Sequence, residues 1–297
     1  MKEQEYIIGN IESFEPKHIF ECGQCFRWNL EQDGSYTGII KNNILNVKKE
    51  KNKIFIKGIG EDNFEELCKD YFDLTTDYQK IKNKLSAKDD NLKNSTKYGA
   101  GIRILNQDEW EALISFIISA NNNIPRIKGI IERISQKYGK EIIWNDKKYY
   151  TFPTVEELSK ATVEDLRKLG LGFRDVRVFE TTRLIKNKKI DLYALKNIED
   201  TNLLREELLK FPGVGPKVAD CIMLFSMKKY EVFPIDVWVK RVMTELYFTN
   251  NNLINPNNKQ ILEFAENKFG KLAGLAQQYL FYWRRELGTG AKRDTWH

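Results

Sequence analysis

Two residues, Lys217 and Asp236, have the types and the spacing to carry out chemistry together. Lys217 is the second residue of a predicted helix that begins at Pro216. The positive end of the helix dipole disfavours an ammonium ion there, and burial would disfavour it further. A neutral lysine amine is a nucleophile. Asp236 follows nineteen residues later, after the apolar run 232–235, and begins another predicted helix.

Each of these two residues also has a simpler interpretation. Lys217 could only touch a phosphate, and Asp236 could be an ordinary helix N-cap. The combination of a hairpin lysine with a Pro-x-Asp sequence about twenty residues later is more specific than either part.

The segment 203–221 predicts how Lys217 is positioned: a short helix, a tight Pro-Gly-Val-Gly hairpin and a second helix. Gly213 and Gly215 have no side chains, so a phosphate can approach the amides at the start of the second helix, where the dipole favours an anion. This pattern resembles the helix–hairpin–helix element that grips DNA phosphates without reading sequence. It predicts DNA binding, and by itself it does not predict catalysis.

The elements along the chain predict an α+β fold with a change of character near residue 95. The first part, 1–95, is predicted to be an antiparallel β domain with one helix at 63–72. Its predicted strands are 6–8, 26–28, 36–40, 44–47 and 53–56. The second part, 96–297, is predicted to be helical, without strands. Asp108, Thr154 and Thr162 are its predicted helix caps. Its predicted helices include 108–118, 124–138, 175–187, 202–210, 216–227, 236–247, 258–268 and 271–286, with a loop at 250–252.

Composition excludes several classes of protein. The 297 residues carry a formal net charge of +6, which is compatible with a polyanionic partner. No apolar run is long enough for a membrane span, and no secretory signal is recognised, so an intracellular protein is expected. Two histidines make a histidine-rich metal site or a Ser-His-Asp triad unexpected. Cys22 and Cys25 have the spacing of a zinc or redox pair, but the sequence has no second closely spaced cysteine pair. They are therefore interpreted as residues of a strand and its neighbouring turn.

Five motifs in order give the chain its resemblance to a known family. They are 23–28 (Gly-Gln-Cys-Phe-Arg-Trp), 121–127 (Asn-Asn-Asn-Ile-Pro-Arg-Ile), 169–174 (Leu-Gly-Leu-Gly-Phe-Arg), 217–221 (Lys-Val-Ala-Asp-Cys), and Gln277 with Phe281. Over nearly its whole length the chain is similar to the helix–hairpin–helix DNA glycosylases, and within them to the bifunctional 8-oxoguanine DNA glycosylases. The resemblance implies a TATA-binding-protein-like β domain on two helical subdomains, with the active site between the helical subdomains.

The resemblance also implies a reaction of base excision repair. The damaged nucleotide is extruded from the duplex. Lys217 attacks C1′ of its sugar, a Schiff base forms, and β-elimination at the 3′ phosphate follows. Asp236 orients or helps to deprotonate Lys217 and stabilises positive charge on the sugar. Relatives that only remove the base lack the lysine.

Recognition of the base would rest on a few pocket residues. 8-Oxoguanine carries a proton at N7, where guanine has a lone pair, and the resemblance implies that the backbone carbonyl of Gly23 reads this difference. With guanine, the Gly23 carbonyl oxygen would face the N7 lone pair. These two buried acceptors would oppose each other and weaken the binding of guanine by about 1–3 kcal/mol. Gln277 would contact the pairing edge, and Phe281 and Cys221 would sandwich the base; Phe225 is a further implied pocket residue. Phe281 could instead be core, because its neighbours are aromatic as well.

The remaining implied residues bind the duplex and a structural ion. Arg126 and Arg174 would hold the cytosine opposite the lesion, Asn121 would fill the vacated space, and Phe173 would be the wedge. The implied contacts of the hairpin with DNA are at Gly213, Gly215 and Val218. The backbone carbonyls of Leu209, Phe211 and Val214 match positions that hold a structural monovalent or divalent cation.

Two positions depart from the family pattern. Trp238 stands where some relatives have histidine, which puts a DNA contact there in doubt, and Phe173 replaces a common tyrosine. No cysteine follows Cys221, so no iron–sulfur cluster is predicted, and no redox cofactor. The expected protein is a monomer without a membrane association, in a bacterial cytoplasm with the nucleoid, or in a nucleus. Two alternatives stay open: a helix–hairpin–helix module that binds DNA without chemistry, and an enzyme for another lesion such as an oxidised pyrimidine.

Overall fold

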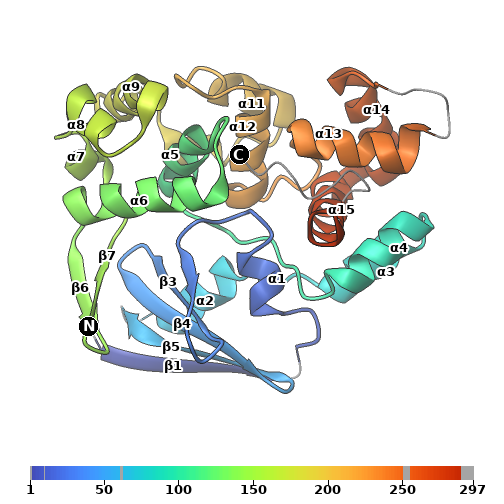
Figure 1. Ribbon diagram of the computed structural model, residues 1–297, viewed down its shortest axis with the longest axis horizontal. Helices are drawn as coiled ribbons and strands as arrows, with labels where there is room; N and C mark the ends of the chain where they lie inside the picture. The colour runs from blue at the N-terminus through green and yellow to red at the C-terminus, as the bar shows by residue number, and fades with distance from the viewer. Residues whose placement is uncertain (1, 10, 61–62, 250–254, 289–297) are drawn as a thin grey trace.

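A computed structural model describes residues 2–9, 11–60, 63–249 and 255–288 of the chain. A twisted β-sheet forms one side of the molecule, and a body of helices lies above it (Figure 1). The predicted loop at 250–252 lies outside the described residues. Within the described part, no helix has the length and apolarity needed to cross a membrane.

The sheet has five antiparallel strands in the order β1-β5-β4-β3-β2, which confirms the predicted antiparallel β domain. Strands β2 to β5 follow one another as a meander, and β1 pairs with β5 at the far edge. Their bounds are β1 Lys2–Gly9, β2 Trp28–Leu30, β3 Tyr36–Ile40, β4 Asn43–Glu50 and β5 Lys53–Gly60. Burial alternates along β5, so Ile54 and Ile56 face a core that also contains Phe64 and Cys68 of α2 (Phe64–Tyr71). The sheet is thus covered on this face by α2, as predicted.

The helices form two neighbouring groups. One group is built around α5 and α12, and the other around α15 (Figure 1). The first group contains α5 Glu109–Ser119, α6 Ile124–Tyr138, α7 Val155–Leu158, α8 Val163–Lys168, the 3-10 turn η1 Gly172–Arg174, α9 Asp175–Lys186, α10 Leu192–Leu195, α11 Thr201–Leu208 and α12 Pro216–Ser226. The second contains α3 Tyr78–Ser86, α4 Asp90–Tyr98, α13 Val237–Met243, the π-helix η2 Thr244–Phe248, α14 Asn258–Phe269, the 3-10 turn η4 Gly270–Leu272 and α15 Ala273–Leu287.

The predicted helix caps are confirmed. Asp108 accepts hydrogen bonds from the backbone N–H groups of Trp110 and Glu111, both at 3.0 Å. Thr154 and Thr162 each form a capping box with the acidic residue three positions later. These caps satisfy N–H groups that a helix leaves unpaired at its first turn.

Four local predictions were wrong. The first part of the chain was predicted to hold one helix, but besides α2 it contains a short helix at Pro16–Phe20 as well as α3 and α4. The helical region contains a β-hairpin, β6 Glu141–Trp144 and β7 Lys147–Tyr150, where no strand was predicted. Asn145 and Asp146 form its turn with φ of 50° and 57°, which is the backbone that a two-residue hairpin requires. Cys22 and Cys25 lie in the bend between α1 (Pro16–Phe20) and β2, and not on a strand. The predicted helix 236–247 changes to a π-helix at Thr244.

Contacts between the sheet and the helical body fix the two parts against each other. Ile142 of β6 packs with Ile39 and Ile44 of the sheet. Lys128 of α6 donates a hydrogen bond to the carbonyl oxygen of Trp28 at 2.7 Å. The domain boundary near residue 95 stays a prediction.

Candidate active site

Lys217 lies at the first turn of α12 beside an aromatic wall. Its Nζ atom is 5.7 Å from the ring centroid of Phe116, which projects from α5. Phe116 stacks on Phe225 with ring centroids 5.5 Å apart, and its edge meets Phe26 at 5.6 Å. Phe26 belongs to the motif that also contains Gly23, so the N-terminal motif and the hairpin lysine meet at one wall.

Lys217 and Asp236 both act electrostatically on Cys221. Burial raises the pKa of the Cys221 thiol to about 11; the positive charge of Lys217 opposes this shift, and the negative charges of Asp220 and Asp236 reinforce it. Cys221 follows Lys217 by one helical turn, so both lie on the same face of α12. Lys217 and Asp236 are therefore both within electrostatic range of Cys221.

Asp236 is the N-cap of α13. Its Oδ1 atom accepts a hydrogen bond of 2.7 Å from the backbone N–H of Val239. The simpler interpretation of this residue is thus true. Its catalytic role stays a prediction.

Gly23 lies in the bend after α1 and faces side chains of the C-terminal helix. Its φ of +87° is in the left-handed region, which favours glycine. A Cβ atom added there would lie 3.5 Å from Cε1 of Phe281 and 3.8 Å from Nη1 of Arg285. Arg285 also donates a hydrogen bond to the carbonyl oxygen of Glu21, which ties this bend to α15.

Gln277 lies one turn before Phe281 on α15 and is buried. Its Oε1 atom accepts a hydrogen bond of 2.8 Å from Nε2 of Gln278. The structure therefore places Gly23 against Phe281, and Gln277 on the same face of the helix as Phe281. Phe225 differs from these residues, because its buried ring stands behind Phe116 as part of the core.

The hairpin between α11 and α12 has the predicted form. The backbone N–H of Val214 donates to the carbonyl oxygen of Phe211 at 3.0 Å and closes the turn. Gly213 has a φ of +88°, and a Cβ atom there would lie 2.8 Å from Cδ of Arg177. The Val218 side chain is buried, so a contact with DNA from this residue would use its backbone N–H. Leu209 ends the first helix as its C-cap.

The residues predicted to face the opposite base gather around the ends of α5 and η1. Asn121 is exposed and has a φ of +50°, and 53% of Phe173 is exposed. Arg126 is exposed, with Nη2 at 3.4 Å from the carbonyl oxygen of Gly170. Arg174, unlike Asn121, Arg126 and Phe173, is buried.

The guanidinium of Arg174 is bound to the protein's own backbone. It donates to the carbonyl oxygens of Ala120 at 2.8 and 2.6 Å, Asn121 at 2.6 Å and Leu171 at 3.3 Å. Burial lowers its pKa, and the positive charges of Arg126 and Arg177 lower it further. In this structure Arg174 holds the Asn121 turn in place. Its contact with cytosine stays a prediction.

Three contact residues were not predicted: Phe116, Arg177 and Arg285. Phe116 sits in the apolar run of α5, where the sequence gives no sign that it differs from core residues. Arg285 follows Phe281 by one turn, and this spacing was the available signal. Arg177 follows Phe173 by the same spacing.

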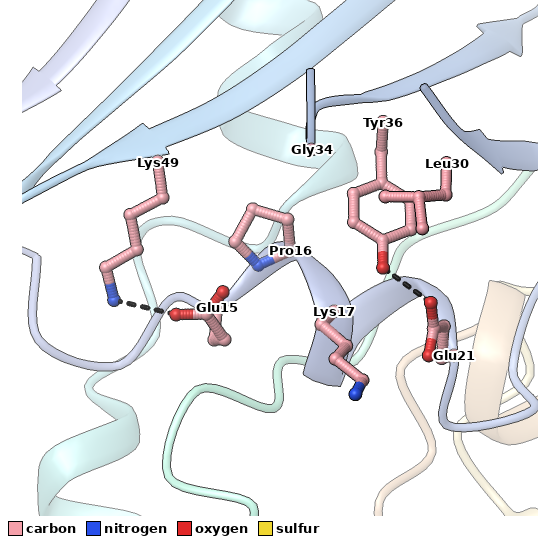
Figure 2. Close-up of a pocket in the computed structure, with 8 residues that line it drawn as sticks. All are labelled: Glu15, Pro16, Lys17, Glu21, Leu30, Gly34, Tyr36 and Lys49. Atoms are coloured by element: carbon pink, nitrogen blue, oxygen red, sulfur yellow. Dashed lines mark hydrogen bonds and ion pairs between the residues drawn. The ribbon is translucent and has the colours of Figure 1, made fainter. Parts of the chain in front are cut away.

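The described residues contain no group of three or more His, Cys, Asp or Glu side chains that could hold a metal ion. All four cysteines are buried free thiols, so Cys22 and Cys25 form no disulfide. A pocket of about 480 Å³ lies away from Lys217, between α1 and the sheet (Figure 2). There Tyr36 donates a hydrogen bond of 2.5 Å to Glu21, and Lys49 pairs with Glu15 at 3.2 Å. None of the predicted site residues lines it.

Comparison with known proteins identifies the family over most of the chain. Residues 6–113 match the family model of the 8-oxoguanine DNA glycosylase N-terminal domain, and residues 114–274 match that of the HhH-GPD superfamily base excision DNA repair proteins. The probable N-glycosylase/DNA lyase of Methanothermobacter thermautotrophicus is 34% identical over 220 residues, 67% of this chain and 69% of that one.

Two crystal structures of the Clostridium acetobutylicum 8-oxoguanine glycosylase/lyase are similar over almost the full length. The apo form is 47% identical, with a TM-score of 0.87, covering 95% of this chain and 97% of that one. The form in complex with double-stranded DNA containing cytosine opposite 8-oxoG is 46% identical, with a TM-score of 0.90, covering 97% and 98%. The chain therefore belongs to the HhH-GPD superfamily of base excision DNA repair proteins and carries the N-terminal domain of the 8-oxoguanine DNA glycosylases.

Proposed function

We propose that this protein is a bifunctional DNA glycosylase and AP lyase that excises 8-oxoguanine, preferentially opposite cytosine. The observation that carries the proposal is the placement of Lys217 in the first turn of the second helix of a helix–hairpin–helix element, beside an aromatic wall, with both Lys217 and Asp236 acting electrostatically on Cys221. The family and its solved relatives support the same activity.

The lysine amine is the nucleophile of the reaction. Nζ of Lys217 attacks C1′ of the extruded nucleotide, and the base leaves with the electron pair of the glycosidic bond. The sugar ring opens to a Schiff base, loss of a C2′ proton follows, and the 3′ phosphate departs by β-elimination. Asp236 stabilises the positive charge that develops on the sugar and helps to deprotonate the amine.

Selection of the lesion rests on the bend that holds Gly23. Its carbonyl accepts a hydrogen bond from the N7 proton of 8-oxoguanine, while Gln277 contacts the pairing edge and Phe281 stacks on the base. The position of Phe281 beside Gly23, where an added Cβ atom would lie 3.5 Å from its ring, supports this assignment, because it brings two predicted pocket residues from opposite ends of the chain together. Arg126, Asn121 and Phe173 form the exposed surface for the opposite base.

The reaction needs no redox cofactor. A structural cation at the carbonyls of Leu209, Phe211 and Val214 would support the hairpin against a phosphate. The protein acts as a monomer on double-stranded DNA, and this substrate places it with the nucleoid of a bacterial cytoplasm or in a nucleus.

Borohydride trapping tests the proposal, because borohydride reduces a Schiff base to a stable adduct. With a duplex that contains 8-oxoguanine opposite cytosine, we expect an adduct with the unaltered protein and none with Lys217→Gln. Lys259→Gln, which changes an exposed lysine of α14, is the matched control and should retain the adduct. An adduct that persists in Lys217→Gln would reject Lys217 as the nucleophile.

A competition series distinguishes the proposal from its alternatives. Excision is measured on duplexes with 8-oxoguanine, an oxidised pyrimidine or intact guanine, each opposite all four bases. Preferential excision of the oxidised pyrimidine would change the assigned lesion. Equal affinity for damaged and intact duplex, without strand cleavage, would leave a DNA-binding module only.

A further inference from the structure

Positive charge gathers around the exposed ring of Phe173. The guanidinium carbon of Arg174 lies 4.2 Å from the ring centroid, and that of Arg177 lies 5.1 Å from it. Arg126 and Arg177 both act electrostatically on Arg174. The nearby carboxylate of Asp175 does not offset this charge cluster, because it is paired with Arg167 at 2.7 Å.

The three arginines differ in what their guanidinium groups bind. Arg174 is bound by backbone carbonyls, and Arg126 has one long contact with Gly170. Arg177 has no hydrogen bond or ion pair with any residue that the structure describes, and it is only half-buried. Its donors are therefore free for an anion from outside the protein.

The stem of Arg177 lies against the hairpin. A Cβ atom at Gly213 would lie 2.8 Å from Cδ and 3.1 Å from Cβ of Arg177, so the absence of a side chain at position 213 makes room for this stem. Arg177 thus touches Phe173 and the hairpin turn at once. Its position is fixed from both sides before any ligand arrives.

We propose that Arg177 is a phosphate-binding residue of the DNA interface, held by Phe173 and Gly213 against the strand that the hairpin grips. A guanidinium presents several N–H donors in a plane, which suits the oxygens of a phosphate. Contact with a phosphate would also supply the negative charge that the arginine cluster lacks. The inference rests on the proposed function, because it requires a DNA duplex.

A merely structural role makes a different prediction. Phe173 and Arg177 are four residues apart, and a helical pair of this spacing can stabilise the local turn without a ligand. Salt dependence separates the two roles, because each phosphate contact releases counterions. The slope of log K against log salt changes by about 0.9 for each contact with duplex DNA.

The experiment measures binding of a duplex with a tetrahydrofuran abasic analogue opposite cytosine, over a range of salt concentrations. Arg177→Met keeps the aliphatic stem and removes the charge, and Arg177→Lys keeps the charge. Arg183→Met is the matched control, since Arg183 is on the same helix and lies 5.5 Å from the ring centroid of Phe179. We expect the magnitude of the slope to fall by about 0.9 in Arg177→Met and to stay unchanged in Arg177→Lys and Arg183→Met.

Two results would overturn the inference. An unchanged slope in Arg177→Met would mean that the side chain only packs, whether or not affinity falls. An equal loss of slope in Arg183→Met would mean that any charge on α9 has the same effect. Thermal melting checks that the variants are folded, and Arg177→Gln provides a second neutral variant with the same expected slope. If the unaltered protein binds neither damaged nor intact duplex, the proposed function fails first.

Discussion

The Nε atom of Arg205 on α11 lies 2.8 Å from Oδ1 of Asp220 on α12, so an ion pair joins the two helices that flank the hairpin. Asp220 is buried, and burial raises its pKa while Arg205 opposes the shift. Asp220 stands between Lys217 and Cys221 on α12. The ion pair therefore fixes the helix that presents the proposed nucleophile.

Removal of one partner of this pair should destabilise the protein strongly. In Arg205→Met the Asp220 carboxylate stays buried without its cation, and breaking such a pair costs about 3–5 kcal/mol. Urea unfolding measures the loss. The control is Lys168→Met, which breaks the exposed pair of Lys168 with Glu164 and should cost less than about 1 kcal/mol. Equal effects of the two substitutions would contradict the structural role of Arg205.

Asp236→Asn should separate catalysis from folding. Asparagine is as good an N-cap as aspartate, so α13 and lesion binding should persist. Loss of the carboxylate charge should lower single-turnover excision by about 10²–10³-fold. Asp200→Asn is the matched control, because Asp200 caps α11 in the same way with hydrogen bonds of 2.8 Å. Turnover at the normal rate in Asp236→Asn would remove the role assigned to this residue.

Gly23→Ala should stop excision through the new methyl group. The methyl would lie 3.5 Å from Phe281, where the base is proposed to enter, and the left-handed backbone would add about 1–2 kcal/mol of strain. Gly34→Ala is the control. The φ of Gly34 is +81°, so the variant has the same backbone strain, but no atom lies within 4 Å of the added methyl group. Melting temperatures should fall alike in the two variants, and excision should fail only in Gly23→Ala. Normal excision in that variant would move the base pocket elsewhere.

Glu111→Gln should change how stability depends on pH. Burial raises the pKa of Glu111 to about 7; Arg27, with Nη1 at 4.0 Å, opposes the shift and Asp108 reinforces it. Between the unfolded pKa near 4.5 and this value, the folded state binds more protons than the unfolded state, so the Glu111 contribution to stability falls as pH rises.

The side-chain amide of Glu111→Gln does not titrate, so in the variant this contribution to stability no longer falls as pH rises. Relative to the unaltered protein, Glu111→Gln should gain stability between pH 5 and pH 8, by at most about 3 kcal/mol. Urea unfolding at the two pH values measures the change, with the exposed Glu164→Gln as the control. A constant stability difference across this range would show that Glu111 does not titrate within it.

Local signals in the sequence predicted most of the architecture. Caps such as Asp108 and Thr154 act within one helical turn, and the glycines of the hairpin act within one backbone turn, so both are visible in a short stretch of sequence. The hairpin at 141–150 was missed because its Asn-Asp turn needs two left-handed residues without glycine. The π-helix at Thr244 likewise has no local signature.

The sequence predicted the site residues that belong to motifs. It did not predict residues whose place in the site depends on packing between helices far apart in the sequence. Phe116 stands beside Lys217 only because α5 packs on α12, and its sequence neighbours, mostly apolar, do not distinguish it from core residues. The backbone contacts of Arg174 are equally invisible, since an arginine in a basic chain gives no sign that carbonyls surround it.

The β6–β7 hairpin gives the enzyme a mechanical property. Ile142 anchors it on the sheet through Ile39 and Ile44, and Tyr150 accepts a hydrogen bond from Arg27, close in sequence to Gly23. The β6–β7 hairpin is therefore joined both to the sheet and to the segment that follows Gly23. A displacement of the sheet would therefore act on the β6–β7 hairpin and on the segment around Arg27 together.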